Sequence, residues 1–264
     1  MSDVITSPAA RVPADVTAVD DPAVEVPTAG VAVPVQVAGP ETTASMRHLF
    51  ADRPAETADP IVDAHRVLQW ANRRFGSGLA VTASFGDAIL AHVANQAIPG
   101  VQVTLLDTGY LFAETEWFAN ELVDRFGINL RVIRPEPGLP TNVWQTDTDA
   151  CCAARKVEPL NRALAGATAW VSGLRRTDSE TRRTAPFVHE DLLRNVVKIN
   201  PLAAWTDADV VTYVAAYGLP DHPLTDRGYP SIGCGPCTRP VREGEDQRSG
   251  RWADSGKTEC GLHL

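Results

Sequence analysis

The sequence lacks the features that mark several classes of protein. No run in its 264 residues approaches the roughly 20 consecutive apolar residues that a membrane-spanning helix needs. Its first 20 residues contain no basic start followed by an apolar stretch, so no secretory signal is expected and the cytoplasm is the predicted location. The formal net charge of −9 argues against a protein that binds duplex nucleic acid.

The first 45 residues lack the side chains from which a core is built. They contain six Pro and ten Val but no Leu, Phe, Tyr, Trp or Lys. Such a segment cannot bury enough apolar surface to fold, and each Pro removes a backbone hydrogen-bond donor. We therefore predict a disordered tail over residues 1–45, with an edge strand at 30–37 as the alternative, and a single folded domain over residues 46–264.

From residue 46 onward, the hydrophobic pattern alternates between strands and helices. Helices are expected over residues 61–75, 88–96, 114–126 and 206–217, with another from about 148, and strands over 79–85, 101–106, 129–133, 168–171 and 196–199. This alternation predicts an α/β fold with a doubly wound, mostly parallel sheet. The last 45 or so residues, rich in Gly, Pro and Arg, predict a loop-built region of the kind that carries functional sites.

Two loops that follow predicted strands are candidates for binding a nucleotide. The loop containing Ser84 and Asp87 leads into a helix, whose N-terminus attracts anions, although it matches neither GxGxxG nor a Walker loop. The next strand ends at Leu106 and Asp107, and the carboxyl ends of parallel strands meet at one edge of the sheet. The alternatives are an ordinary turn for the first loop and a helix cap for Asp107.

A run of arginines supplies a third candidate. Four Arg fall within the nine residues 175–183 of an otherwise acidic chain. Because the planar guanidinium suits phosphate and sulfate oxygens, the run that begins at Arg175 predicts an anion site. A solvated charged surface is the alternative.

The cysteines form two pairs and one single residue. Cys151 and Cys152 are adjacent, and Cys234 and Cys237 form a CxxC motif in a Gly/Pro loop. Four thiolates are enough for an iron–sulfur cluster or for zinc, and the adjacent pair fits a zinc site badly. A redox-active dithiol in the CxxC motif would leave the adjacent pair unexplained. Cys260, close to Lys257 and His263 near the end of the chain, is either a reactive nucleophile or a thiol without a role.

Together these motifs resemble the assimilatory sulfonucleotide reductases, which reduce activated sulfate. The match runs in one order from about Gly78 to His263, and its strongest parts are CCxxxK at 151–156, CxxC at 234–237 and ECGLH at 259–263. The resemblance implies the adenine nucleotide α-hydrolase-like fold, which agrees with the predicted sheet.

The resemblance also implies a cofactor, a substrate and a partner. In this family, the two cysteine pairs hold one 4Fe–4S cluster per chain and accompany adenosine 5′-phosphosulfate (APS) as substrate, whereas members without them use 3′-phosphoadenosine 5′-phosphosulfate (PAPS). The implied activity is reduction of APS to sulfite and AMP through an S-sulfocysteine on Cys260. Because no thioredoxin-like domain is visible, the expected reductant is a separate thioredoxin.

The remaining site residues are assigned by the same resemblance. Lys156 lies four residues after Cys152, so on a helix it would share a face with that cysteine and supply a cation between cluster and substrate. His263 is expected to position or deprotonate Cys260. The residues expected to bind the substrate are Ser84, Asp87, Leu106, Asp107, Arg175, Arg248 and Arg251, with Arg239 as a further basic position.

Three other functions are compatible with parts of the sequence. Reduction of PAPS would use the same chemistry. An ATP pyrophosphatase would usually carry a fuller Ser-Gly-Gly-x-Asp-Ser loop than the one around Ser84. A non-enzymatic iron–sulfur sensor would need only the four cysteine ligands, and nothing in that role requires the motif around Cys260.

Overall fold

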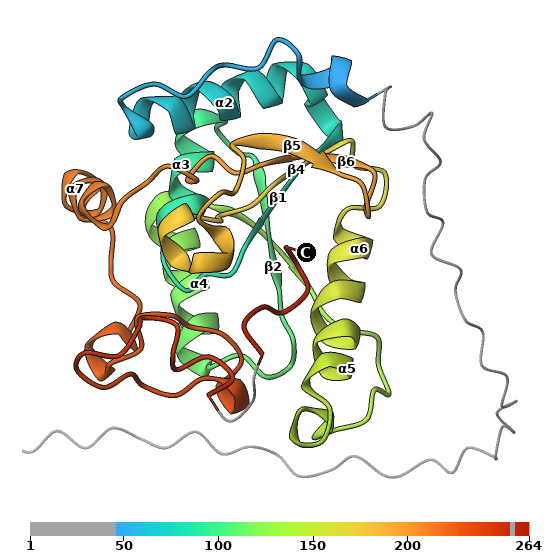
Figure 1. Ribbon diagram of the computed structural model, residues 1–264, viewed down its shortest axis with the longest axis vertical. Helices are drawn as coiled ribbons and strands as arrows, with labels where there is room; N and C mark the ends of the chain where they lie inside the picture. The colour runs from blue at the N-terminus through green and yellow to red at the C-terminus, as the bar shows by residue number, and fades with distance from the viewer. Residues whose placement is uncertain (1–45, 254–256, 264) are drawn as a thin grey trace, which may run out of the picture. The chain divides into compact units, whose positions relative to one another are not determined.

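The structure is a computed structural model that describes residues 46–253 and 257–263. The predicted disordered tail over residues 1–45 lies outside the described residues. Six strands form one sheet in the order β3-β2-β1-β4-β6-β5 (Figure 1). The strands are β1 (Leu79–Ala83), β2 (Gln102–Leu106), β3 (Asn129–Ile133), β4 (Ala169–Val171), β5 (Val188–Asp191) and β6 (Val196–Ile199).

The sheet is parallel except at one edge, where β5 pairs antiparallel to β6. The strand order reverses between β1 and β4, which places the switch point of a doubly wound sheet at the centre. The doubly wound, mostly parallel prediction is therefore confirmed. The edge strand β5 was not predicted, because its sequence Val-His-Glu-Asp is short and mostly polar.

The helices begin and end where local side chains dictate. They are α2 (Pro60–Phe75), α3 (Ile89–Ala97), α4 (Ala113–Phe126), α5 (Thr148–Cys152), α6 (Glu158–Ala163) and α7 (Asp207–Tyr217). A side-chain oxygen of Asp59 accepts hydrogen bonds from the backbone N–H groups of Ile61 and Val62 in the first turn of α2. Pro60 is the first residue of the helix, where a backbone N–H would have no partner within the helix. Helix α4 ends at Gly127, whose φ of 64° is the left-handed conformation that glycine adopts without strain.

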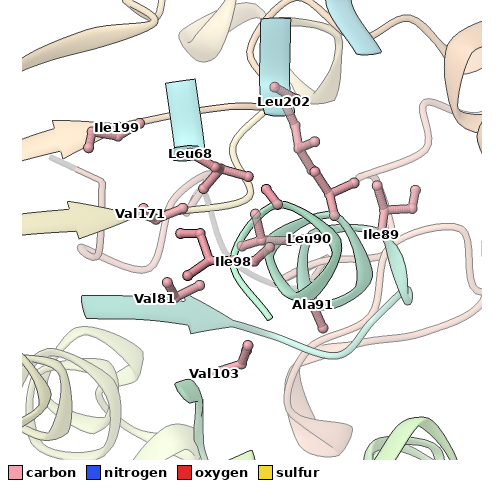
Figure 2. Close-up of a cluster of buried hydrophobic side chains, with 14 of the residues drawn as sticks. Leu68, Val81, Ile89, Leu90, Ala91, Ile98, Val103, Val171, Ile199 and Leu202 are labelled. Carbon is pink, nitrogen blue, oxygen red and sulfur yellow. The ribbon is translucent and has the colours of Figure 1, made fainter. Parts of the chain in front are cut away.

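The main core lies between the sheet and the face covered by α2, α3 and α4. Leu68 of α2 and Leu90 of α3 pack with Val81, Val103 and Val171 of the strands, and all five are buried (Figure 2). A smaller core on the opposite face contains Leu160 and Leu164 of the α6 segment, together with Trp170 and Val196. Near-continuous apolar strands covered on both faces are typical of parallel sheets.

The helix that carries the adjacent cysteines is not a continuous α-helix. Between α5 and α6 the residues Ala153–Val157 form a π-helical turn. Pro159 explains the break, because its ring lacks an N–H and would clash with the carbonyl of residue 155 in an unbroken α-helix. The expected simple four-residue spacing from Cys152 to Lys156 is therefore replaced by a wider turn.

Among the described residues, no helix has both the length and the apolar character needed to cross a membrane.

Candidate active site

A cavity of about 260 Å³ lies at the carboxyl edge of the sheet. Its walls come from the ends of β1, β2 and β4 and from the C-terminal loops. Nine residues singled out from the sequence line it: Ser84, Asp87, Leu106, Lys156, Arg175, Arg248, Arg251, Cys260 and His263. The structure thus brings together residues that are up to 179 positions apart in the chain (263 − 84 = 179).

The loop between β1 and α3 turns sharply at the cavity. Phe85 has a φ of 54°, an uncommon conformation for a side chain of its size, and it is buried. Asp87 accepts a hydrogen bond from the backbone N–H of Ile89 at 2.9 Å, and burial raises the pKa of its carboxyl group. The loop therefore directs the N-terminus of α3 toward the cavity, where it would favour an anion.

Asp107 does not line the cavity, in contrast to the prediction. Its carboxylate accepts from the N–H of Gly109 at 2.8 Å and pairs with Arg134 at 2.8 Å. Leu106, one residue earlier, does line the cavity. The difference follows from strand geometry, because successive side chains point to opposite sides.

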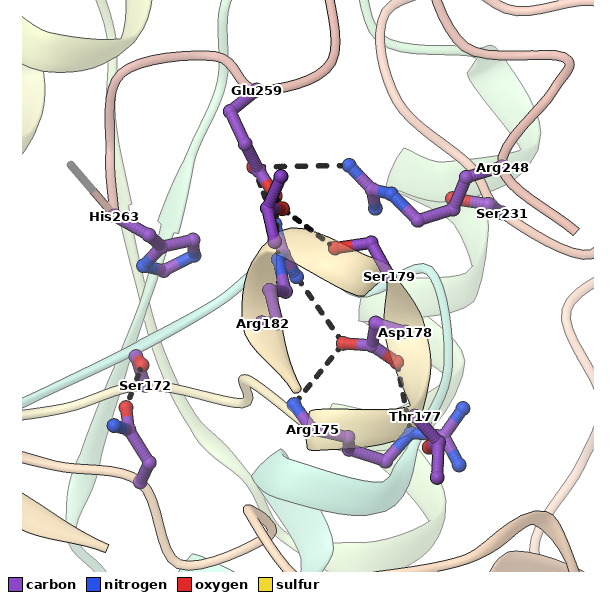
Figure 3. A network of polar contacts seen from close by, with 12 residues as sticks. Ser172, Arg175, Thr177, Asp178, Ser179, Arg182, Ser231, Arg248, Glu259 and His263 are labelled. Atoms are coloured by element: carbon purple, nitrogen blue, oxygen red, sulfur yellow. Dashed lines mark hydrogen bonds and ion pairs between the residues drawn. The ribbon is translucent and has the colours of Figure 1, made fainter. Parts of the chain in front are cut away.

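The arginine run is largely paired with carboxylates of the protein. Arg175 contacts Asp178 at 3.0 Å, and Arg182 contacts the same carboxylate at 3.2 Å (Figure 3). Arg175 also contacts Asp207 at 3.0 Å. Arg176 pairs with Glu56, and Arg183 pairs with Glu180. Arg175 and Arg182 face the cavity, but the run as a whole is not an open anion site.

Arg251 forms part of the wall of the cavity. Its Nη1 donates to the carbonyl of Ile232 at 3.0 Å, its guanidinium lies 4.8 Å from the ring centroid of Trp252, and burial lowers its pKa. Its Nε is buried and has no hydrogen-bond partner among the described residues. Gly233 lies directly beneath the guanidinium, where a side chain would clash.

Arg248 lines the same cavity, and its guanidinium is 3.8 Å from Glu259. Burial and the neighbouring Arg182 lower the pKa of Arg248. Arg239 lies outside the cavity wall and pairs with Glu245 at 2.9 Å, so the structure does not support it as a substrate contact.

Cys260 is buried on the cavity wall, with an exposed fraction of 8%. It packs in a small apolar cluster with Cys152, Trp252 and Leu262. Its neighbour Glu259 forms a two-point ion pair with Arg182, with both N···O distances at 2.7 Å (Figure 3). The thiol near the end of the chain is therefore held in place, and it lies beside the segment that carries the adjacent cysteines.

His263 is also held in the structure. Its ring stacks on that of Trp170, with centroids 5.7 Å apart and planes 11° apart. Its Nδ1 lies 3.2 Å from the Nζ of Lys198. Burial, followed by nearby cations of which Lys198 is the largest contributor, lowers the pKa of His263 well below its usual value.

The four paired cysteines line one small cavity next to the main one. Cys151 and Cys152 reach it from α5, and Cys234 and Cys237 reach it from the C-terminal loop. All four are free thiols, and the Sγ of Cys234 lies 3.2 Å from the Oγ1 of Thr108. Burial raises the pKa of the thiols of Cys151, Cys152 and Cys237, which disfavours bare thiolates. Within residues 46–253 and 257–263, no three His, Cys, Asp or Glu side chains form a group suited to a single metal ion.

Lys156 lies between the two cavities. It lines both, and its Nζ is 6.0 Å from the ring centroid of Trp252, which also lines both. The predicted placement of this cation between the cysteines and the nucleotide loop matches that position.

Residues 78–240 match the phosphoadenosine phosphosulfate reductase domain. The chain belongs to this family. The matched part of the reductase contains the nucleotide loop and both cysteine pairs, and it ends before Cys260.

Individual relatives of this reductase support the assignment. A protein of Streptomyces coelicolor named adenosine 5′-phosphosulfate reductase is 46% identical over 207 residues, covering 76% of this chain and 88% of the relative. A protein of the same name from Mycolicibacterium smegmatis is 42% identical over 230 residues, covering 84% and 97%.

Solved structures show the same fold. A phosphoadenylyl-sulfate reductase from Candida auris, in a phosphate complex, superposes with a TM-score of 0.59 at 24% identity, covering 71% of this chain and all of that one. An FMN adenylyltransferase from Candida glabrata has a TM-score of 0.51 at 14% identity, covering 78% and 75%. The shared architecture is the adenine nucleotide α-hydrolase-like fold, as predicted.

Several residues at the reductase cavity were not identified from the sequence. Trp252 and Trp170 form parts of the cavity wall. They were missed because, from the sequence alone, a single Trp in a loop or strand cannot be distinguished from a core residue. Thr108 lines both cavities, and its Oγ1 lies 3.2 Å from the Sγ of Cys234. It directly follows Asp107, and nothing in the sequence distinguished it from its neighbours. Lys198 carried no sequence signal, because it lies in an otherwise apolar strand.

Proposed function

We propose that this reductase converts APS to sulfite and AMP in sulfate assimilation. The observation that carries the proposal is that Cys260 and the two arginines Arg248 and Arg251 share the wall of one cavity with the nucleotide loop. A nucleophilic thiol beside cations is what an attack on an anionic sulfur compound requires. The names of the curated relatives support APS as the substrate.

The proposed reaction has two steps. The Cys260 thiolate attacks the sulfur of APS, a sulfur–sulfur bond forms, and the bond from sulfur to the bridging oxygen breaks as AMP leaves with its electron pair. A thiol of thioredoxin then attacks Cys260, releasing sulfite and leaving a mixed disulfide that the second thioredoxin thiol resolves. The dithiol supplies both electrons, so no other reductant is needed.

The arginines would bind the anionic part of the substrate. Arg251 lines the cavity, and its buried Nε has no partner among the described residues, so an oxyanion within its reach would satisfy it. The Nη2 of Arg248 lies 3.8 Å from a carboxylate oxygen of Glu259. Because a guanidinium has five N–H donors, others remain for a second anion. Ser84 and Leu106 would line the nucleotide pocket.

The cofactor is part of the proposal. Four free thiols around one small cavity, three of them buried, fit the donor set of a 4Fe–4S cluster. Bonds to iron would offset the raised pKa values of Cys151, Cys152 and Cys237. Cys151, Cys152, Cys234 and Cys237 would hold it. When bound, the cluster would supply a strong local field and order the loops around it. Lys156, on the walls of both cavities, would offset that field on the side of the substrate.

A sulfite assay tests the proposed function. Protein purified without oxygen is mixed with APS and thioredoxin, and sulfite and AMP are measured; we expect both in equal amounts. In a competition with PAPS, we expect APS to be preferred. Formation of AMP and pyrophosphate from ATP would instead indicate a pyrophosphatase, and no turnover of either sulfonucleotide would favour a sensor. We also propose a cytoplasmic location, where thioredoxin is kept reduced.

A further inference from the structure

Three cationic residues outside the proposed catalytic set contact the segment that carries Cys260. The first is Arg182, whose guanidinium holds both carboxylate oxygens of Glu259 at 2.7 Å. The two side chains are only 11% and 12% exposed, so this pair is screened far less than a surface ion pair. It fixes the residue immediately before Cys260 (Figure 3).

The second cation, Arg194, fixes the residue immediately after Cys260. Its Nη2 donates to the carbonyl oxygen of Gly261 at 3.2 Å. Arg194 is itself held by Asp191 at 2.8 Å in the turn between β5 and β6, where both side chains are almost fully buried. The turn therefore presents a rigid donor to the backbone of the C-terminal segment.

The third cation, Lys198, fixes His263. Lys198 and Trp170 are register partners on β6 and β4, so their side chains lie on the same face of the sheet. The Nζ of Lys198 is 4.5 Å from the centroid of the Trp170 ring and 3.2 Å from the Nδ1 of His263, whose ring stacks on Trp170. Lys198 is buried, and no carboxylate of the described residues lies within ion-pair distance of it.

The contact with Lys198 also determines what His263 can do. An ammonium group has only donors, so the Nδ1 of His263 must accept and its proton must reside on Nε2. Burial, and after it the nearby cations, lowers the pKa of His263, which keeps the ring neutral and able to accept. In this arrangement the ring, which lines the cavity, has one N–H donor on Nε2 and no free acceptor with which to deprotonate Cys260.

We propose that Arg182, Arg194 and Lys198 form a seat for residues 257–263 that positions Cys260 on the cavity wall and presents the Nε2–H of His263 to the bound anion. The three are positioning residues, because they act through Glu259, Gly261 and His263. The inference rests on the proposed role of Cys260 as nucleophile. It adds a docking site on the β5–β6 edge of the sheet for the segment that carries this nucleophile.

Alkylation of Cys260 measures whether the segment is seated, independently of the reaction. Holoenzyme is treated with iodoacetamide without substrate, and the rate of labelling at the Cys260 peptide is followed by mass spectrometry. Because Cys260 is only 8% exposed, iodoacetamide should react slowly with the seated thiol and faster when the segment opens, so a rise in the labelling rate reports opening. Because loss of a charge-assisted hydrogen bond shifts such an equilibrium about ten- to a hundredfold, we expect Arg182→Met, Arg194→Met and Lys198→Met to accelerate labelling by that factor.

Arg183→Met is the matched control. Arg183 follows Arg182 directly, is 72% exposed, and pairs with Glu180 on the surface. We expect its labelling rate to equal that of the wild type. Lys198→Arg, which keeps a buried donor, should label more slowly than Lys198→Met. If Arg182→Met does not fold, Glu259→Gln tests the same ion pair from the side of the C-terminal segment. Wild-type labelling rates in Arg182→Met, Arg194→Met and Glu259→Gln would overturn the seat.

Two further measurements separate the seat from the proposed function. The seat predicts that transfer of sulfonate from APS to Cys260 in a single turnover slows in the seat variants. The dissociation constant for AMP should stay unchanged in Arg194→Met and Lys198→Met, since neither residue lines the cavity. Loss of AMP affinity in these two variants would mean that the cations support the whole cavity, which contradicts a positioning role. If the wild type itself forms no S-sulfocysteine, the proposed function fails, whereas the alkylation rates still decide whether the seat exists.

Discussion

Cys260 combines two properties that seldom occur together in one thiol, because it is almost fully buried and yet lies on a cavity wall. A structural cysteine needs only the first property, and a nucleophile needs access to a substrate. The neighbouring Cys152 is buried as well, but it belongs to the second cavity. At the scale of single residues, the structure thus separates one candidate nucleophile from four candidate ligands.

The first prediction follows from this separation. Cys260→Ser should abolish sulfite release and leave the visible iron–sulfur absorbance unchanged, because the serine cannot form the S-sulfonate and the four candidate ligands remain. Sulfite formation and the absorption spectrum are measured on the same anaerobic sample. Loss of the absorbance would show that Cys260 is a ligand. In the wild type, APS without reductant should add one sulfonate to the peptide carrying Cys260, and a label on Cys234 or Cys237 would contradict the assignment.

A second prediction concerns the cavity arginines. Arg248→Ala and Arg251→Ala should each weaken APS binding by about ten- to a hundredfold, since a hydrogen bond from a charged group to an anion is worth about 1.5–3 kcal/mol. Arg239→Ala is the control, because Arg239 belongs to the same loop region but pairs with Glu245 away from the cavity. Binding of AMP and APS is measured by calorimetry in the Cys260→Ser background, in which APS cannot react with the protein. Equal dissociation constants in all three variants would remove the arginines from the site.

At the scale of the element, the π-helical turn Ala153–Val157 explains how one short segment serves two cavities. Cys151 and Cys152 point to the smaller cavity, and Lys156 reaches the walls of both. Single π-turns within helices occur frequently at functional sites. The sequence indicated the break only indirectly, through Pro159.

The third prediction tests that turn. An oxidised 4Fe–4S cluster with four thiolates carries a charge of about −2 by formal counting, and the substrate is anionic as well. Without a cation between them, the repulsion in a partly dry site would oppose binding and reaction. Lys156→Ala should therefore keep the cluster absorbance but lose most of its turnover of APS. Turnover at the wild-type rate would show that the cluster and the substrate are not coupled through this side chain.

Most elements of the fold could be predicted from the sequence, because parallel strands buried on both faces leave a strong apolar signal. Strands β3 and β6 were placed to the residue, and β1, β2 and β4 within two residues. The strand β5 could not be predicted, since its sequence is short and mostly polar and it forms an edge of the sheet by pairing with β6.

The candidate site was predictable to the extent that its residues sit in short motifs. The cysteines, the nucleotide loop and the arginines after the CxxC motif share a cavity or its neighbour, as expected. The predictions that Asp107 and Arg239 contact the substrate were wrong, because a sequence motif does not specify on which side of the chain each side chain lies. The contacts of Arg194 and Lys198 with residues 261 and 263 join segments more than 60 positions apart, and such pairings leave no local pattern.

At the scale of the whole molecule, the positions of the charges indicate more about the substrate than the net charge does. The chain carries −9 overall, yet four of its arginines, Arg175, Arg182, Arg248 and Arg251, line one cavity. An acidic surface with a basic cavity attracts small anions to one place while it repels polyanions such as nucleic acids. The pattern agrees with a small anionic nucleotide as the substrate.

The last prediction concerns what holds the two cavities together. Cys151 and Cys152 come from the α5 segment, whereas Cys234 and Cys237 come from a loop some 80 residues further on, so a bound cluster would tie these segments together (234 − 152 = 82). A ligand that binds only the folded state raises the free energy of unfolding. The increase grows with the logarithm of the ratio of the ligand concentration to its dissociation constant. Replacing any one of the four with Ser should therefore give colourless protein with a lower melting temperature, and removing iron from the wild type with a chelator should lower it similarly.

Cys260→Ser is the control for this series, because it removes a thiol of similar burial that is not a candidate ligand. It should melt at the wild-type temperature with iron bound. Hydrogen exchange should show where the stabilisation acts, with protection lost at Thr148–Cys152 and around Gly235–Cys237 and retained in the central strands. Stoichiometric zinc in protein purified without oxygen would contradict the cluster, since one tetrahedral ion would then occupy the four thiolates. Unchanged melting in all four Ser variants would mean that the cysteines do not act as a unit and that other contacts, such as the packing around Trp252, hold the two segments together.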